Sequence, residues 1–323
     1  MRMKRRDFLY SALSMSAVVH GGAQTLLEST VNSQSDTPIP KRRYKNDDML
    51  SLIGFGGIVC LNQSSKECAN IVAEAFDSGV NYFDVAPSYG DGEAEQRLGP
   101  ALEQYRQRAF LACKTMHRDA KGSQQELEQS LRRLRTDHFD LYQFHAVTTL
   151  EEVDKIFSRG GAIETFLKAR DAGRIRYIGF SAHSEEAALE MMDRFGFDSI
   201  LFPFNVVCYS QGKFGPRVLE RAKEKGVARL ALKALAYSPW SSGAERTHPK
   251  CWYQPITDRE LATQALRFTL SEDVTSALPP GDQGLFRLAL EIGANFTPMN
   301  QQEREKLIAR TEGVQSLFPL KGN

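Results

Sequence analysis

Four polar residues of this chain lie at or just beyond the ends of short apolar runs. They are Asp84 and Tyr89 in FDVAPSYG, Lys114 in FLACKT and His145 in DLYQFH. A tyrosine is a poor acid at neutral pH unless its anion is stabilised, and a nearby ammonium group would stabilise it. A carboxylate keeps that ammonium charged and in place, and a histidine can hydrogen-bond the oxygen that is being protonated. The set therefore suits proton delivery to a carbonyl group.

Proton delivery is only half of a carbonyl reduction, because hydride must also reach the carbonyl carbon. No side chain supplies hydride, so this chemistry implies a nicotinamide cofactor, NADP(H) or NAD(H). A metal cofactor is not expected, since the chain has no histidine and cysteine residues at metal-ligand spacing. The expected partner is a small-molecule carbonyl compound.

Strand-like and helix-like segments alternate along the chain, as they do in a barrel of parallel strands. Strands are expected over residues 51–55, 81–84, 109–114, 140–144, 177–181, 199–204, 228–233 and 274–278. Helical periodicity is found over residues 68–78, 124–134, 163–172, 185–194, 217–225 and 258–270, and a further helix is expected over residues 284–292. The pattern predicts an α/β fold, a (β/α)8 TIM barrel with eight parallel strands. Such a barrel would gather the four polar residues at one face.

Composition places limits on what the protein does. The chain has 323 residues, of which 41% are hydrophobic and 25% charged, so it can bury a full core. A formal net charge of +1 gives no electrostatic case for nucleic-acid binding. No two cysteines form a CxxC pair, and core or surface thiols without a role are expected at Cys60, Cys68, Cys113, Cys208 and Cys251.

The N-terminal residues 1–27 differ in kind from the rest and predict an export signal. Arg5 and Arg6 precede Phe-Leu, a short apolar run and then small residues, which resembles a twin-arginine signal. We therefore expect the twin-arginine export machinery as a partner and the periplasm as the location. The apolar run is too short for a stable membrane span. The alternative is a disordered basic start before a chance apolar run.

Residues 28–40 are rich in serine, threonine and proline and are expected to form a linker. Residues 41–323 then form the barrel domain.

Four stretches of the barrel domain resemble the aldo-keto reductases, in order and at similar spacing. They are NYFDVAPSYGDGEAEQRLG, the Lys114 strand, the His145 strand and RIRYIGFSAHS. The opening RRYKNDDMLSLIGFGG is also similar to the family's N-terminal hairpin and first barrel strand. The resemblance implies a (β/α)8 barrel that binds NADPH or NADH, with the four residues above as the catalytic tetrad.

Several residues are candidates for binding the cofactor. They are Gly57 after the first strand, Ser181 in GFSAHS, Lys233 at a strand end, and Gly281 and Asp282 after the eighth strand. Asp282 would repel a 2′-phosphate and could instead accept a hydrogen bond from a ribose hydroxyl. Arg287 is the nearby basic candidate for a 2′-phosphate. The choice between NADP(H) and NAD(H) therefore stays open.

The longest loop is expected after the seventh strand and carries three large aromatic residues, Trp240, Trp252 and Tyr253. Loops that follow strands line the active face of a barrel. Flat aromatic faces can pack against sugar rings, so a sugar-like carbonyl substrate is expected. The alternative is that these rings only anchor the loop.

Together these features predict an NAD(P)(H)-dependent oxidoreductase that interconverts a carbonyl and an alcohol, with tyrosine as the proton donor or acceptor. The alternative is a sensor or subunit that binds a nicotinamide cofactor with little turnover. It depends on Leu201, Leu232 and the pair Ala289-Leu290, which stand where the family often has glutamine, an aromatic residue and Glu-Asn. A barrel hydrolase or isomerase is less favoured, because neither paired catalytic carboxylates nor a metal cluster is evident at the strand ends.

Overall fold

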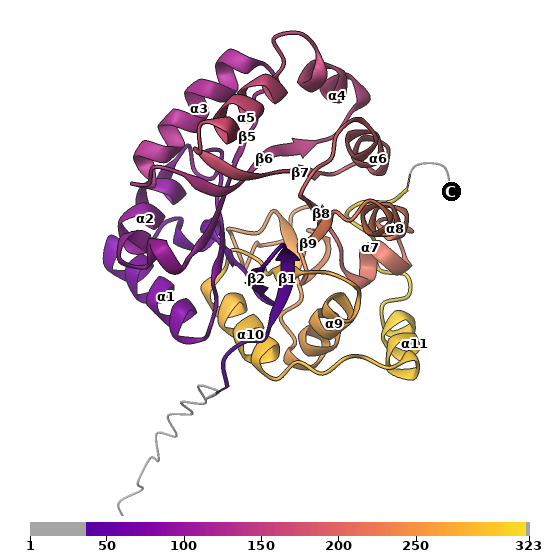
Figure 1. Ribbon diagram of the computed structural model, residues 1–323. Coiled ribbons are helices and arrows are strands. Elements are labelled where there is room, and N and C mark those ends of the chain that lie inside the picture. Colours follow the sequence, from indigo (N-terminus) through magenta and orange to yellow (C-terminus); the bar gives the residue numbers. More distant parts are fainter. Residues whose placement is uncertain (1–36, 321–323) are drawn as a thin grey trace, which may run out of the picture. The chain divides into compact units, whose positions relative to one another are not determined.

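The computed structural model describes residues 37–320, in which eight parallel strands form one barrel sheet (Figure 1). The strands are β3 (Phe55–Gly56), β4 (Tyr82–Asp84), β5 (Phe110–Thr115), β6 (Phe139–Val147), β7 (Ile175–Ala182), β8 (Ser199–Pro203), β9 (Ala228–Leu232) and β12 (Ser276–Leu278). They are hydrogen-bonded in chain order. A parallel bridge between Ile53 and Ala277 brings the two edges together. The predicted α/β barrel is confirmed.

Helices follow the strands and surround the barrel (Figure 1). They are α1 (Ser65–Asp77), α2 (Glu93–Leu102), α3 (Ala120–Arg133), α4 (Leu150–Phe157), α5 (Ala162–Asp171), α6 (Glu185–Arg194), α7 (Val206–Ser210), α8 (Pro216–Glu224), α9 (Arg259–Ser271), α10 (Gln283–Ala294) and α11 (Gln301–Arg310), with the short 3-10 helices η1 (Gly57–Cys60) and η2 (Glu103–Arg108). Capping boxes at Ser64, Thr149 and Asn300 satisfy backbone N–H groups where α1, α4 and α11 begin. Helix α6 has the predicted bounds, whereas α2, α4, α7 and α11 are additional to the predicted set.

Apolar side chains form two layers, one inside the barrel and one between the strands and the helices. Alternation along β4 shows how: Tyr82 belongs to the inner cluster, and Phe83 belongs to the outer one. The Phe83 ring stacks on Phe76 of α1 with their centroids 4.9 Å apart. Burial of one such ring contributes about 1.5–3 kcal/mol. The inner layer fills the barrel below Asp84, which lies on the same face of β4 as Tyr82.

A hairpin of β1 (Lys41–Lys45) and β2 (Asp48–Ser51) covers the N-terminal end of the barrel. Its Tyr44 hydroxyl donates to Ser199 Oγ at 2.9 Å, where β8 begins. Ser51 pairs with Lys41 in this hairpin. The first barrel strand is therefore shorter than the predicted 51–55, because the start of that run is used by the hairpin.

The loop after β9 contains a second hairpin, of β10 (Ala236–Pro239) and β11 (Tyr253–Pro255). Buried Ala236, Cys251 and Tyr253 pack together, with Leu317 of the C-terminal segment against them. The loop is therefore folded into a hairpin that packs against the C-terminal segment.

Two of the five cysteines form a disulfide bond, which corrects the expectation of unpaired thiols. Cys60 of η1 is bonded to Cys68 of α1, and their Cα atoms are 5.3 Å apart. The turn between η1 and α1 brings these two positions together, although their spacing matches no short motif. Cys113, Cys208 and Cys251 are free and buried.

The predicted signal, residues 1–27, and most of the predicted linker lie outside the described residues. Between residues 37 and 320 no helix is both long enough and apolar enough to cross a membrane.

Candidate active site

The four residues predicted to do chemistry lie together at the C-terminal ends of β4, β5 and β6. Lys114 Nζ forms an ion pair with the Asp84 carboxylate. It also lies 3.3 Å from Tyr89 Oη and donates to the backbone carbonyl of Val85 at 3.2 Å. The His145 ring stands edge-on to the Tyr89 ring, with their centroids 5.7 Å apart. One ammonium group therefore joins the carboxylate to the tyrosine.

Local structure explains how these side chains meet. Asp84 is the last residue of β4, and its register partner on β5 is Ala112, two residues before Lys114. Because alternate residues share a face, Lys114 points into the barrel as Ala112 does. Tyr89 follows in a turn, in which its N–H donates to the carbonyl of Ala86 at 3.0 Å. This turn brings the ring back over the strand end.

The second oxygen of Asp84 is held by two residues that were not expected at the site. The Tyr82 hydroxyl donates to Oδ2 at 3.1 Å, and Gln143 Nε2 donates to it at 3.0 Å. Gln143 is the register partner of Lys114 on β6. Gln143 could have been found from the sequence, because it is a polar residue within an apolar strand. It lies two positions before His145 and therefore on the same face of the strand.

Burial and charge oppose each other at this site. Burial alone would lower the pKa of Lys114, but Asp84 and Tyr89 outweigh it, and the pKa of Lys114 lies above its usual value. Burial raises the pKa of Tyr89, and Asp84 adds to this effect, while Lys114 acts in the opposite direction. The net result is a tyrosine pKa above the usual value. We expected Lys114 and Asp84 together to lower it; Lys114 does so, but burial and Asp84 exceed its effect.

His145 is held in its neutral form. Burial lowers its pKa well below the usual value, and the charges of Lys114 and other nearby cations add to the effect. Its Nδ1 lies 3.3 Å from Ser88 Oγ, and Arg118 donates to its backbone carbonyl at 2.6 Å. A neutral imidazole can donate a hydrogen bond to a carbonyl oxygen without protonating it.

Ser181, predicted as a cofactor contact, lies on β7 beside the bulge that follows His145. Its Oγ accepts a hydrogen bond from the N–H of Ala146 at 2.7 Å. Ala146 has a φ of +53°, a left-handed conformation that is unfavourable for alanine. The serine thereby stabilises the bulge and keeps its own O–H to donate to a bound molecule.

The other predicted cofactor contacts lie at the ends of β3 and β12. A Cβ atom at Gly57 would meet Val85 Cγ2 at 2.7 Å, and one at Gly281 would overlap Ile58. Both glycines therefore permit close approach of neighbouring loops. Asp282 caps α10, since its Oδ1 accepts from the N–H of Leu285 at 3.0 Å.

Arg287, the basic candidate for a 2′-phosphate, is engaged elsewhere. Its guanidinium group donates to both carboxylate oxygens of Glu74, at 2.8–3.0 Å. Binding a phosphate would require this pair to open.

Lys233 directly follows β9 and is buried. Its Nζ lies 3.3 Å from His183 Nε2 and over the rings of Trp252 and Phe318. Burial lowers the pKa of Lys233 to about 7 and the pKa of His183 to about 3. No pattern in the sequence links His183 to Lys233, which lies 50 positions further on.

The three aromatic residues of the long loop have different surroundings. Trp240 Nε1 donates to the carbonyl of Cys251 at 2.9 Å, and Tyr253 is buried. Both therefore anchor the loop. Trp252 is 53% exposed, and its ring lies edge-on to Tyr253 and Phe318. Of the three, it has the most surface to offer a ligand.

A groove of about 1110 Å³ runs beside the ends of β6 and β7. Thr148, His183 and Phe214 line it, and the C-terminal residues Pro319 and Leu320 form part of its wall. It borders the same face of the barrel as the tetrad, because Thr148 follows β6 and His183 follows β7.

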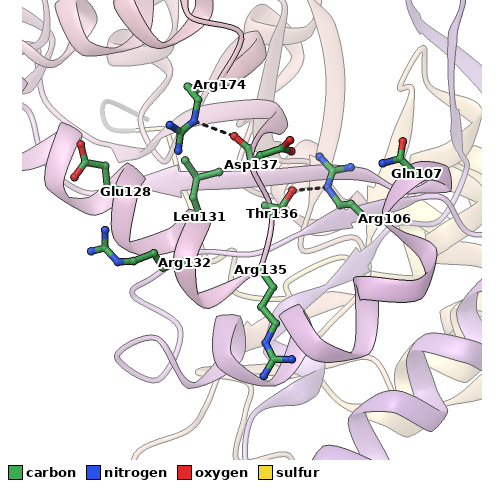
Figure 2. A pocket seen from close by; sticks show the side chains of 9 residues that line it. All are labelled: Arg106, Gln107, Glu128, Leu131, Arg132, Arg135, Thr136, Asp137 and Arg174. Atoms are coloured by element: carbon green, nitrogen blue, oxygen red, sulfur yellow. Dashed lines mark hydrogen bonds between the residues drawn. The ribbon is translucent and has the colours of Figure 1, made fainter.

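A second depression, of about 780 Å³, lies near the N-terminal ends of β5, β6 and β7 (Figure 2). Two of its arginines bind the protein itself: Arg174 donates to the carbonyl of Asp137, and Arg106 donates to Thr136 (Figure 2). It lies at the opposite end of the strands from the tetrad, and in a barrel of this type that end serves stability.

No group of three or more potential metal ligands occurs within residues 37–320.

Comparison with known proteins gives a consistent result. A sequence profile of the Aldo/keto reductase family matches residues 52–278. The chain is 25% identical over 303 residues to the uncharacterised oxidoreductase YqkF of Bacillus subtilis, covering 84% of this chain and 96% of that protein. It is 30% identical over 197 residues to the aldo-keto reductase YhdN of the same organism, covering 56% of each.

Solved structures show the same fold. The holo form of aldo-keto reductase AKR11C1 from Bacillus halodurans superposes with a TM-score of 0.69 at 24% identity, covering 88% of this chain and 98% of that one. An aldo-keto reductase from Klebsiella pneumoniae in complex with NADPH superposes with a TM-score of 0.64 at 18% identity, covering 88% and 97%.

Proposed function

Because the chain belongs to the aldo/keto reductase family, we propose that it interconverts a carbonyl and an alcohol by hydride transfer, with Tyr89 as proton donor and acceptor. One observation carries this proposal: Lys114 Nζ is shared between the Asp84 carboxylate and Tyr89 Oη in a buried strand-end site. Bound NADPH or NADH would supply the hydride.

The residues then have distinct tasks. Tyr89 gives its hydroxyl proton to the carbonyl oxygen in reduction and removes a proton in oxidation. Its raised pKa keeps the proton in place until transfer, and Lys114 stabilises the phenolate that results. Neutral His145 hydrogen-bonds the carbonyl oxygen and orients it. A donor aimed at a developing oxyanion typically contributes about 3 kcal/mol.

Substituting Tyr89 by phenylalanine tests the proton transfer, because it removes one hydroxyl and keeps the ring. Turnover should fall by about 10²-fold or more, while NADPH and NADH titrations stay near wild type. Single-turnover rates measured beside fluorescence titrations would decide. An undiminished rate contradicts the assignment. A wild-type chain that binds cofactor but reduces no carbonyl would favour the sensor alternative.

Gly57, Ser181, Gly281 and Asp282 would hold the cofactor. The free O–H of Ser181 suits the carboxamide, and the start of α10 offers N–H groups to a phosphate. The NADPH complex of the Klebsiella pneumoniae relative supports a dinucleotide here. Asp282→Asn removes the negative charge and keeps the helix cap, because asparagine caps a helix as well as aspartate does. It should shift the ratio of dissociation constants towards NADPH; an unchanged ratio would place the 2′-phosphate elsewhere.

A sugar-like carbonyl compound is the proposed substrate, and the exposed ring of Trp252 is the proposed contact with it. Trp252→Ala should raise KM for keto-sugars or aldoses more than for model aldehydes. Trp240→Phe serves as the control, because it alters only the anchor of the loop. Better kcat/KM for model aldehydes than for every sugar would exclude this class.

Export to the periplasm by the twin-arginine route is the proposed localisation. It rests on the sequence of residues 1–27, and the Cys60–Cys68 disulfide supports it, because such bonds persist in oxidising compartments. Replacing Arg5 and Arg6 by lysine should retain the protein inside the cell. Wild-type protein found in the cytoplasm with Met1 intact would contradict export.

A further inference from the structure

Lys233 is a second buried lysine near the barrel mouth, and it lacks a carboxylate partner. It is 6% exposed. Among residues 37–320, the hydrogen-bond partner of its Nζ is His183 Nε2, at 3.3 Å, and no aspartate or glutamate pairs with it. A buried cation without an anion is costly, so such a group is rarely kept for stability alone.

The surroundings of Lys233 fix its ammonium group in place. The residue has a φ of +61°, in the left-handed region, and Asn205 Nδ2 donates to its carbonyl at 3.2 Å. The rings of Trp252 and Phe318 have their centroids 5.5 and 5.6 Å from Nζ. These rings exclude water from the charge and provide no counter-ion, so an anion that reaches Nζ would bind it strongly.

This lysine lies close to the tetrad. The charge of Lys233 contributes to the lowered pKa of His145. His183, the hydrogen-bond partner of Lys233, lines the groove beside β6 and β7, so this groove leads to the ring that contacts the lysine. Glu185, Glu186 and Glu190 line the same groove and would repel an anion, whereas the ammonium group of Lys233 would attract it.

We propose that Lys233, with His183 as its hydrogen-bond acceptor, binds a carboxylate group carried by the carbonyl substrate. The proposal rests on the carbonyl–alcohol chemistry proposed above and narrows its substrate class to oxo acids, which for a sugar-like substrate means sugar acids. The other anion available is the diphosphate of the dinucleotide, and the experiment separates the two.

Binding is measured first, because it does not depend on turnover. The full chain, with and without saturating NADPH, is titrated calorimetrically with benzoate and with benzamide, its uncharged counterpart of nearly the same shape. Benzoate should bind about tenfold more tightly or better, the usual worth of a hydrogen bond to a charged group. NADPH should leave this preference intact. Equal binding of the two probes overturns the proposal, and displacement of benzoate by NADPH assigns the lysine to the cofactor diphosphate.

Substitutions test whether the preference for benzoate over benzamide depends on Lys233. Lys233→Met keeps a side chain of similar length and removes its charge. The ratio of benzoate affinity to benzamide affinity should then fall to about one. Lys213→Met is the matched control: Lys213 is exposed and also has a left-handed backbone, with φ of +52°. If Lys233→Met does not fold, as judged by circular dichroism, His183→Asn replaces it and should reduce the preference in the same direction. A preference that survives in a folded variant of Lys233 overturns the proposal.

Turnover is measured last, with 4-carboxybenzaldehyde and 4-formylbenzamide. The wild type should favour the carboxylate in kcat/KM, and Lys233→Met should lose that ratio. If neither aldehyde is reduced while the benzoate preference depends on Lys233, the carbonyl reaction fails and the anion site stands. If both are reduced at equal kcat/KM, the reaction stands and the oxo-acid proposal fails.

Discussion

Lys114 and Lys233 are the same residue type at the same end of two different barrel strands, β5 and β9, and they differ in their partners. Both stand at the C-terminal end of a barrel strand, and both are buried. Lys114 has the Asp84 carboxylate beside it, and its pKa lies above the usual value. Within residues 37–320 the hydrogen-bond partner of Lys233 Nζ is His183 and no carboxylate pairs with it, and its pKa is lowered to about 7.

The difference shows that a buried charge can either be paired within the protein or be left available to bind a ligand. The charge of Lys114 is satisfied within the protein, so it is permanent and can act on Tyr89. The charge of Lys233 has no carboxylate beside it within residues 37–320, so the folded state is less stable than it would be with an apolar residue at this position. A site kept at the expense of stability is a site kept for a ligand.

The largest expected effect comes from breaking the satisfied pair. Lys114→Met leaves the Asp84 carboxylate buried without its cation, which should lower the free energy of unfolding by about 3–5 kcal/mol. Turnover should also fall by about 10²–10³-fold, because the phenolate of Tyr89 loses its charged neighbour. Urea unfolding and steady-state kinetics measure the two effects.

A second substitution checks the cause. In the double variant Lys114→Met with Asp84→Asn no unpaired charge is left, so stability should recover in part while activity stays low. A double variant less stable than the sum of the two single changes would show that packing, and not charge, dominates at this site.

A smaller effect of opposite sign is expected at Lys233. Lys233→Met should raise the free energy of unfolding by about 1–3 kcal/mol, because it removes a buried charge that has no counter-ion. Urea unfolding of this variant beside Lys213→Met, which should change stability little, measures the gain. Loss of stability would mean that His183 and the surrounding rings satisfy Lys233 fully.

The smallest effect concerns pH. The pKa of Lys233 is about 7 in the fold and 10.5 in an unperturbed lysine, so the penalty for its charge is complete below pH 7 and disappears as the pH rises to 10.5. The stability gain of Lys233→Met should therefore be largest at or below pH 7 and shrink by pH 10. Thermal unfolding of both proteins across this range tests the trend. A gain that does not vary with pH would argue against a titrating lysine.

Much of this molecule could be predicted from local patterns in the sequence. Apolar runs and helical periodicity gave the order of the barrel elements, and α6 was predicted to the residue. The tetrad could also be predicted, because Asp84, Lys114 and His145 each lie within two residues of the end of a strand, and parallel strands end at one face. For these residues position in the chain largely determines position in space.

The features that were missed depend on three-dimensional packing that no short motif in the sequence marks. His183 and Lys233 meet only because β7 and β9 both end at the mouth, with one strand between them. The Cys60–Cys68 bond depends on the turn between η1 and α1. The net direction of the Tyr89 pKa depends on burial, which sequence does not reveal for a residue in a loop.

The β1–β2 hairpin has a consequence for how the chain is made. Arg42 donates to the carbonyls of Leu270 and Val274, which lie 228 and 232 positions later in the chain. The hairpin therefore leaves the ribosome early, but its binding surface is complete only when the chain has been synthesised as far as Val274, just before β12. Contacts this distant in sequence form late. Most of the chain must therefore be translated before the N-terminal hairpin can make all of its contacts with the barrel.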